Sequence, residues 1–89
     1  VTKSAILNLT RYIANLYGKH NIRCNTLSPS GVATDKLSTA FKKRYASRNA
    51  FKRMAKVSDY AGPLVFLCSE ASGYMTGANL IIDGGWTAR

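Results

Sequence analysis

The chain has 89 residues, of which 46% are hydrophobic, and its formal net charge at pH 7 is +9. This length allows one small domain, and the composition is typical of a globular protein and excludes a disordered one. The sequence has no apolar run of about 18 residues and no recognisable secretory signal, so we expect no transmembrane helix and a cytoplasmic protein.

The positive charge is concentrated in one segment. Eight of the thirteen basic residues lie between Lys36 and Lys56, where there is no acidic residue, whereas the other five are nearly balanced by four acidic residues. The basicity is therefore a local property of residues 36–56.

The two cysteines are expected to be reduced, buried thiols, with a disulfide as the alternative. Cys24 and Cys68 lie far apart in the sequence and have apolar neighbours. A Cys/His metal site is not expected, because His20 is the only histidine and there is no Cys-x-x-Cys motif. His20 itself is expected in a solvated loop.

The first predicted element is a helix over residues 3–17. Apolar side chains recur there at helical spacing, at Ile6, Leu9, Ile13 and Leu16. Gly18 follows as a helix stop.

A short strand is predicted over residues 21–27, ended by Pro29, which cannot donate a hydrogen bond to a sheet. Residues 36–49 then favour a basic helix. A further helix is predicted over 58–69, with Ser58 as its N-cap and Asp59 in its first turn. Pro63 removes one backbone donor from this helix, so we expect a tight or slightly kinked start.

The last predicted elements are a loop over residues 71–77 and a strand over residues 78–85 that stops at two glycines. A strand, a helical crossover and a second strand favour parallel pairing. Parallel sheets have several strands and both faces covered, and two strands are too few. The sequence also lacks an initiator Met and opens within a helical pattern. We therefore expect the end of an α/β sheet whose other strands lie upstream.

Four stretches, taken together, resemble the C-terminal part of short-chain dehydrogenases/reductases: "KSAILNLTRYIANLY", "NIRCNTLSPSGVAT", "FLCSEASGYMTG" and "NLIIDGG". They occur in the family's order and at about its spacing. The resemblance implies that residues 1–89 are the C-terminal part of a single dinucleotide-binding oxidoreductase domain, with a Rossmann-type, doubly wound parallel sheet. It implies hydride transfer between NAD or NADP and an alcohol or carbonyl substrate.

Lys3 matches the lysine of the family's Tyr-x-x-x-Lys motif, and the tyrosine would fall two positions before Val1. A phenol has a pKa of about 10, and a nearby ammonium lowers that pKa toward the operating pH, where a general base is most useful. In the family this lysine also hydrogen-bonds the nicotinamide ribose. The glycine-rich phosphate loop, the residues that select NAD or NADP and the catalytic serine are absent from this sequence, so we expect the 89 residues alone to be inactive.

The loop after the first strand matches the family's nicotinamide-side wall. Ligands of open α/β sheets lie beyond the carboxyl ends of the strands. The resemblance assigns cofactor contacts to Pro29, Ser30, Gly31, Val32 and Thr34, with the backbone of Val32 and the hydroxyl of Thr34 reaching the carboxamide or a phosphate. The family usually has glycine at the position of Ser30. Serine costs about 1 kcal/mol there if φ is positive. An ordinary turn at the end of a strand is the alternative.

Residues 36–56 match the family's substrate lid, whose inner face we assign to Leu37, Phe41, Phe51 and Met54. Its charge favours an anionic substrate, such as a carboxylate or a phosphate ester, and a solvated basic helix is the alternative. The resemblance gives a structural role to residues 74–77 and to the turn at residues 83–85. It also implies that the helix over 58–69 and the strand over 79–83 pair subunits in a homo-oligomer, a dimer or a tetramer.

Two other functions stay open at this point. The basic segment also suits a module that binds anions or nucleic acid, although no reader motif is present. The third interpretation is a non-catalytic structural relic that pairs with full-length subunits. The anion- or nucleic-acid-binding module leaves the common register of Lys3, Pro29 and Asp83 unexplained, and the oxidoreductase is the leading interpretation.

Overall fold

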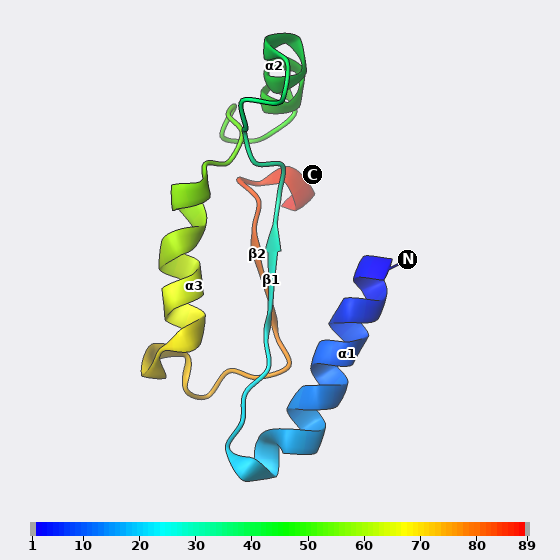
Figure 1. Ribbon diagram of the computed structural model, residues 1–89, viewed down its shortest axis with the longest axis vertical. Coiled ribbons are helices and arrows are strands. Elements are labelled where there is room, and N and C mark those ends of the chain that lie inside the picture. Colours follow the sequence, from blue (N-terminus) through cyan, green and yellow to red (C-terminus); the bar gives the residue numbers. More distant parts are fainter. Residues whose placement is uncertain (1, 89) are drawn as a thin grey trace. The chain divides into compact units, whose positions relative to one another are not determined.

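The computed structural model describes residues 2–88. Its helices are α1 (Thr2–Tyr17), α2 (Thr39–Ser47) and α3 (Ala61–Cys68), and its strands are β1 (Thr26–Pro29) and β2 (Asn79–Ile82) (Figure 1). Short 3-10 helices cover Gly18–His20, Val57–Tyr60, Glu70–Ser72 and Trp86–Ala88. No helix within residues 2–88 has the length and apolar character needed to cross a membrane.

The two strands pair in a parallel sheet, as the sequence predicts. The chain divides into two compact units, each containing part of both strands. The first unit comprises residues up to Leu27 together with Leu64–Leu80, and the second comprises Ser28–Pro63 together with residues from Ile81 onward.

The predicted helix over residues 3–17 is confirmed as α1 in the first unit. Ala14 is buried, and the Thr10 hydroxyl donates to the carbonyl of Ile6 and contacts the Thr26 hydroxyl at 2.7 Å. The predicted apolar face is only partly covered, because Leu9 remains 55% exposed. The helix ends at Tyr17, and Asn21 then adopts a left-handed φ of 61°.

The first strand begins later than predicted: it covers Thr26–Pro29 rather than residues 21–27. The residues before Thr26 use their hydrogen bonds on the loop that leads to β2. The N–H of Cys24 donates to the Thr76 hydroxyl, and the carbonyl of Cys24 accepts from the N–H of Gly77. The sheet ladder therefore begins only where the N–H of Thr26 reaches the carbonyl of Ala78, at 2.8 Å.

Arg23 organises this loop. Its Nη1 donates to the carbonyl and the hydroxyl of Ser72, both at 2.9 Å, and to the carbonyl of Met75. Its Nη2 donates to the carbonyls of Leu67 and Ser69. These acceptors lie in the last turn of α3, in the 3-10 helix Glu70–Ser72 and in the residues next to that 3-10 helix, a region that was predicted to be loop from residue 71 to residue 77. One guanidinium thus satisfies carbonyls that the end of a helix leaves without partners.

Both ends of α2 and the end of β2 differ from the predicted boundaries. α2 is shorter than residues 36–49, because Thr34–Leu37 form a turn and the Ser38 hydroxyl caps the helix by accepting from the N–H of Phe41. β2 stops at Ile82, before the predicted residue 85, because Gly84 and Gly85 adopt positive φ values of 62° and 91°.

The helix predicted over residues 58–69 begins as a 3-10 helix at Val57 and becomes α-helical at Ala61, so the expected tight start is confirmed. The prediction of Ser58 as N-cap is wrong. The backbone N–H of Lys56 donates instead to the Asp59 carboxylate at 2.7 Å. The two cysteines are free, but the prediction that they are buried is wrong: Cys24 is half-buried and Cys68 is exposed.

We expect Arg23→Lys to lower the free energy of unfolding of the intact protein by about 2–4 kcal/mol, because an ammonium cannot reach all the carbonyls that the planar guanidinium holds. Urea denaturation measures this loss. The control is Arg11→Lys on the exposed side of α1, for which we expect a change within about 0.5 kcal/mol. Equal effects of the two substitutions would contradict the role of Arg23.

Candidate functional site

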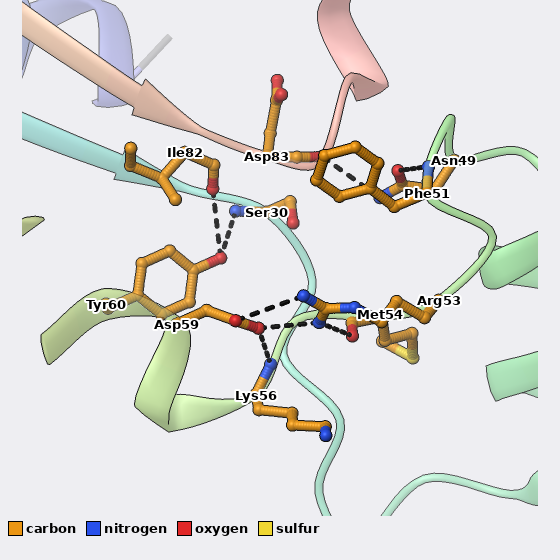
Figure 2. A network of polar contacts seen from close by, with 10 residues as sticks. All are labelled: Ser30, Asn49, Phe51, Arg53, Met54, Lys56, Asp59, Tyr60, Ile82 and Asp83. Carbon is orange, nitrogen blue, oxygen red and sulfur yellow. Dashed lines mark hydrogen bonds and ion pairs between the residues drawn. The ribbon is translucent and has the colours of Figure 1, made fainter. Parts of the chain in front are cut away.

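The loop that follows β1 is held by two tyrosine hydroxyls. The N–H of Ser30 donates to the Tyr60 hydroxyl at 3.1 Å, and the N–H of Gly31 donates to the Tyr45 hydroxyl at 2.7 Å. Tyr60 lies in the 3-10 helix Val57–Tyr60, and its hydroxyl also donates to the carbonyl of Ile82 at the end of β2 (Figure 2). The loop is thus tied to three different elements of the second unit.

A parallel bridge extends the loop beyond Gly31. The N–H of Ala55 donates to the carbonyl of Gly31, and the N–H of Ala33 donates to the carbonyl of Ala55. In such a bridge the central residue, here Val32, directs its own N–H and C=O away from the partner strand. Within residues 2–88 these two groups of Val32 make no hydrogen bond. Val32 therefore offers one backbone donor and one backbone acceptor to a ligand.

Ser30 does not carry the backbone strain that glycine would relieve. Within residues 2–88, only Asn21 and Lys52 among the residues other than glycine have positive φ. The Ser30 hydroxyl is buried and has no hydrogen-bond partner among these residues. It borders a cavity of about 120 Å³, which Arg53, Asp59 and Tyr60 also line.

Gly31 is required because Tyr45 lies very close to it. A Cβ atom at this position would lie 2.7 Å from Cζ of Tyr45 and 2.9 Å from its hydroxyl. The Tyr45 ring has little freedom to retreat, because it stacks on the Trp86 ring with centroids 4.4 Å apart.

An ion pair fixes the corner that carries Ala55 and Tyr60. Nη1 and Nη2 of Arg53 donate to the two carboxylate oxygens of Asp59, at 2.8 and 3.2 Å (Figure 2). The Arg53 hydrogen bond and the backbone N–H of Lys56 lower the pKa of Asp59 from 3.8 to about 2. The same carboxylate raises the pKa of Arg53.

Asn49 joins residues 36–56 to the turn after β2, a role that the sequence did not indicate. Its side chain is 2% exposed, donates to the carbonyl of Asp83 and accepts from the N–H of Phe51 (Figure 2). The Asp83 carboxylate accepts from the Thr87 hydroxyl and from the N–H groups of Gly85 and Thr87, and these bonds lower its pKa. The predicted structural role of this turn thus has a physical basis.

The structure brings the loop residues together with Tyr45, Ala55 and Tyr60. Of the predicted lid residues, Met54 is buried, Leu37 is half-buried, and Phe41 and Phe51 are exposed. Pro29 and Thr34 are exposed at the two ends of the loop. Lys3 is exposed in the first turn of α1, in the first unit, whereas the loop belongs to the second.

A model of the family described as Enoyl-(Acyl carrier protein) reductase matches residues 1–87. Among curated relatives, 2-dehydro-3-deoxy-D-gluconate 5-dehydrogenase of Escherichia coli (strain K12) is 40% identical over 93 residues, covering 99% of this chain and 37% of the relative. L-rhamnose 1-dehydrogenase (NAD(P)(+)) of Azotobacter vinelandii is 42% identical, covering 94% of this chain and 35% of the relative.

Solved structures give the same match. A short chain dehydrogenase from Leptospira borgpetersenii with bound NAD+ superposes with a TM-score of 0.91 at 40% identity, covering 97% of this chain and 34% of that protein. A 4-hydroxyisoleucine dehydrogenase complexed with NADH superposes with a TM-score of 0.86 at 33% identity, covering 98% of this chain and 37% of that protein. The chain thus spans about a third of the length of the proteins it matches, and the predicted Rossmann-type fold is confirmed.

We expect Gly31→Ala to lower the free energy of unfolding by about 1–3 kcal/mol, because the added methyl group overlaps the Tyr45 ring. Gly62→Ala in α3 is the matched control. A Cβ atom at Gly62 meets no atom within 4 Å, and alanine has the higher helix propensity, so stability is retained or raised. Urea denaturation of the intact protein measures the free energy of unfolding of both variants. An unchanged free energy of unfolding in Gly31→Ala would contradict the close contact.

The low pKa of Asp59 predicts a specific pH dependence. Because the pKa falls on folding, the stabilisation is complete above the ordinary value of 3.8 and is lost as the pH falls toward about 2. Asp59→Asn should therefore reduce the fall in stability between pH 5 and pH 3, measured by urea denaturation at both values. Asp35→Asn, at an exposed residue without an ion pair in the described chain, is the control. An unchanged pH dependence in Asp59→Asn would show that the pair does not act in solution.

Proposed function

Because the chain belongs to the short-chain dehydrogenase/reductase family, we propose that the full-length protein is an NAD(P)-dependent oxidoreductase. It transfers a hydride between the nicotinamide cofactor and a small alcohol or carbonyl substrate. The curated relatives described above are dehydrogenases, and none of them supports the alternative of a nucleic-acid-binding module.

The observation that carries this proposal is the unpaired backbone of Val32. A carboxamide has one acceptor oxygen and a donor NH₂ group, which complement an N–H and a C=O on one residue. The loop lies beyond the carboxyl ends of two parallel strands, where α/β sheets bind their ligands. The residues present therefore fit a nicotinamide, with Pro29, Ser30 and Gly31 shaping the loop and the Thr34 hydroxyl as a further donor.

Lys3 is the catalytic residue that this chain contributes. A bound nicotinamide would supply or accept the hydride, and the tyrosine that the family resemblance places two positions before Val1 would move the proton. The Lys3 ammonium would stabilise the phenolate form of that tyrosine and lower its pKa. The family resemblance also gives Lys3 a hydrogen bond to the nicotinamide ribose.

Residues 36–56 act as the lid over the substrate. Met54 is buried and anchors the segment, whereas Phe41 and Phe51 are 41% and 69% exposed and are available to contact a substrate. Hydrogen bonds of Tyr45 and Ala55 hold this segment to Gly31, and a hydrogen bond of Asn49 holds it to Asp83. A segment held at such points, with exposed side chains between them, suits a lid that excludes water.

A second copy of the chain is the proposed partner of α3 and β2. In α3, Leu64 and Val65 are 53% and 67% exposed, and in β2 Ile81 is 50% exposed. Apolar surfaces of this kind fit the isologous contacts of a homodimer or of a tetramer built from dimers.

The test is turnover of an alcohol and carbonyl panel by the full-length protein with NAD and with NADP. Lys3→Ala should lower kcat by about 10²–10⁴-fold and move the rise of the pH–rate profile to higher pH, because the tyrosine loses its neighbouring ammonium. Lys19→Ala, which removes an exposed ammonium beyond the end of α1, is the control and should leave both unchanged. Absence of turnover with either cofactor would refute the proposal. The 89 residues alone, which have no glycine-rich phosphate loop, should be inactive.

A further inference from the structure

One face of α2 carries aromatic and cationic side chains in alternation. Phe41, Arg44 and Tyr45 in α2 and its C-cap residue Arg48 follow one another at i, i+3, i+4 and i+7, the spacing that places residues on a single helix face. Together with Trp86 they line an open hollow of about 290 Å³, which we call the α2 hollow. All five residues belong to the second unit.

Three aromatic rings form the apolar part of the α2 hollow. Tyr45 and Trp86 stack with an interplanar angle of 21°, and the Phe41 ring lies 6.2 Å from that of Tyr45. Stacked rings bury apolar area at low entropic cost and present a flat surface to carbon atoms of a ligand.

The described lining of the α2 hollow is positively charged. Arg44 and Arg48 both line it, and no Asp or Glu side chain among residues 2–88 does. The Arg44 guanidinium is exposed and forms no hydrogen bond or ion pair with the residues that the structure describes. A guanidinium binds carboxylates and phosphates through two parallel hydrogen bonds.

The α2 hollow shares a side chain with the candidate cofactor loop. Tyr45 contributes its ring to the hollow, and its hydroxyl accepts the N–H of Gly31 at 2.7 Å. A ligand in the hollow therefore lies one side chain away from the loop that is proposed to hold the nicotinamide. A substrate must lie next to the nicotinamide to exchange a hydride with it, so the hollow is suitably placed to bind part of the substrate.

We propose, on the basis of the function proposed above, that the α2 hollow binds an anionic group of the substrate, a carboxylate or a phosphate ester, through Arg44. The carbon chain of the substrate lies against Phe41, Tyr45 and Trp86. The enzyme accordingly acts on hydroxy and keto acids, or on their phosphorylated counterparts, in preference to neutral alcohols of the same size.

The test compares matched substrates in the full-length protein with its cofactor. Hydroxy acids are paired with their methyl esters, and sugar phosphates with the free sugars, so that each pair compares an anion with a neutral molecule of the same carbon skeleton. The wild-type protein should favour the anionic member, and the favoured pair distinguishes a carboxylate from a phosphate. Arg44→Gln should raise KM for that anion by about 10-fold or more, with kcat and the neutral substrates little changed.

Lys43→Gln is the matched control, because Lys43 is an exposed residue of α2 that does not line the hollow and its loss changes the charge equally. We expect it to raise KM by less than about 2-fold. Equal effects of the two substitutions, or esters turned over as well as acids, would overturn the anion site and leave the oxidoreductase function standing.

A binding measurement separates failure of the anion site from failure of the proposed function. Titration calorimetry follows succinate and inorganic phosphate binding to the full-length protein, independently of turnover. We expect Arg44→Gln to weaken the binding of the anion about 10-fold and Lys43→Gln to leave it unchanged. This result would support the site even if no alcohol is oxidised. Absence of binding of both anions would overturn the site.

Discussion

The loop conformation in the second unit depends on two hydrogen bonds made by the first two residues after β1. Pro29 is the last residue of the strand, so the N–H groups of Ser30 and Gly31 no longer have ladder partners. Buried backbone donors need acceptors, and the hydroxyls of Tyr60 and Tyr45 supply them. These two bonds fix the loop to the end of β2 and to α2. They thereby set the position of Val32, whose unpaired N–H and C=O carry the functional proposal.

Directional polar contacts also hold the segments around the loop. Asn49 joins residues 36–56 to Asp83, and the Arg53–Asp59 pair holds the corner that presents Ala55. Because hydrogen bonds specify direction as well as distance, these contacts orient the segments on either side of the loop.

Periodicity predicted α1 well, because a helix depends on a local pattern of apolar residues, and the order of strand, helical crossover and strand predicted the parallel pairing. The start of β1 was misplaced, because the side chains of Arg23 and Asn25 bind the segment over residues 67–78, about fifty residues away. No local pattern encodes such a contact. Lys3 and the cofactor loop were identified only through the resemblance to a family, and their individual roles stay predictions.

The tyrosines of the site were missed for a related reason. In an apolar stripe, tyrosine is indistinguishable from phenylalanine, so the sequence does not indicate that the hydroxyls of Tyr60 and Tyr45 act as hydrogen-bond acceptors. Their hydroxyls matter because Ser30 and Gly31 lie 30 and 14 residues away in the sequence and come within hydrogen-bond distance only in the folded chain. Asn49 illustrates the same limit, since its partners are Asp83 and the backbone of Phe51.

Serine in place of the family's glycine at position 30 changes the side chain and leaves the backbone of the loop intact. The expected backbone penalty does not arise, because φ at Ser30 is not positive. The hydroxyl has no hydrogen-bond partner among the described residues and borders the cavity of about 120 Å³. The N–H of the same residue is bound to Tyr60, which fixes the direction of the chain into Gly31. The shape of the loop is therefore set by Tyr60 and Tyr45, and glycine is needed only at position 31, where the Tyr45 ring leaves no space for a side chain.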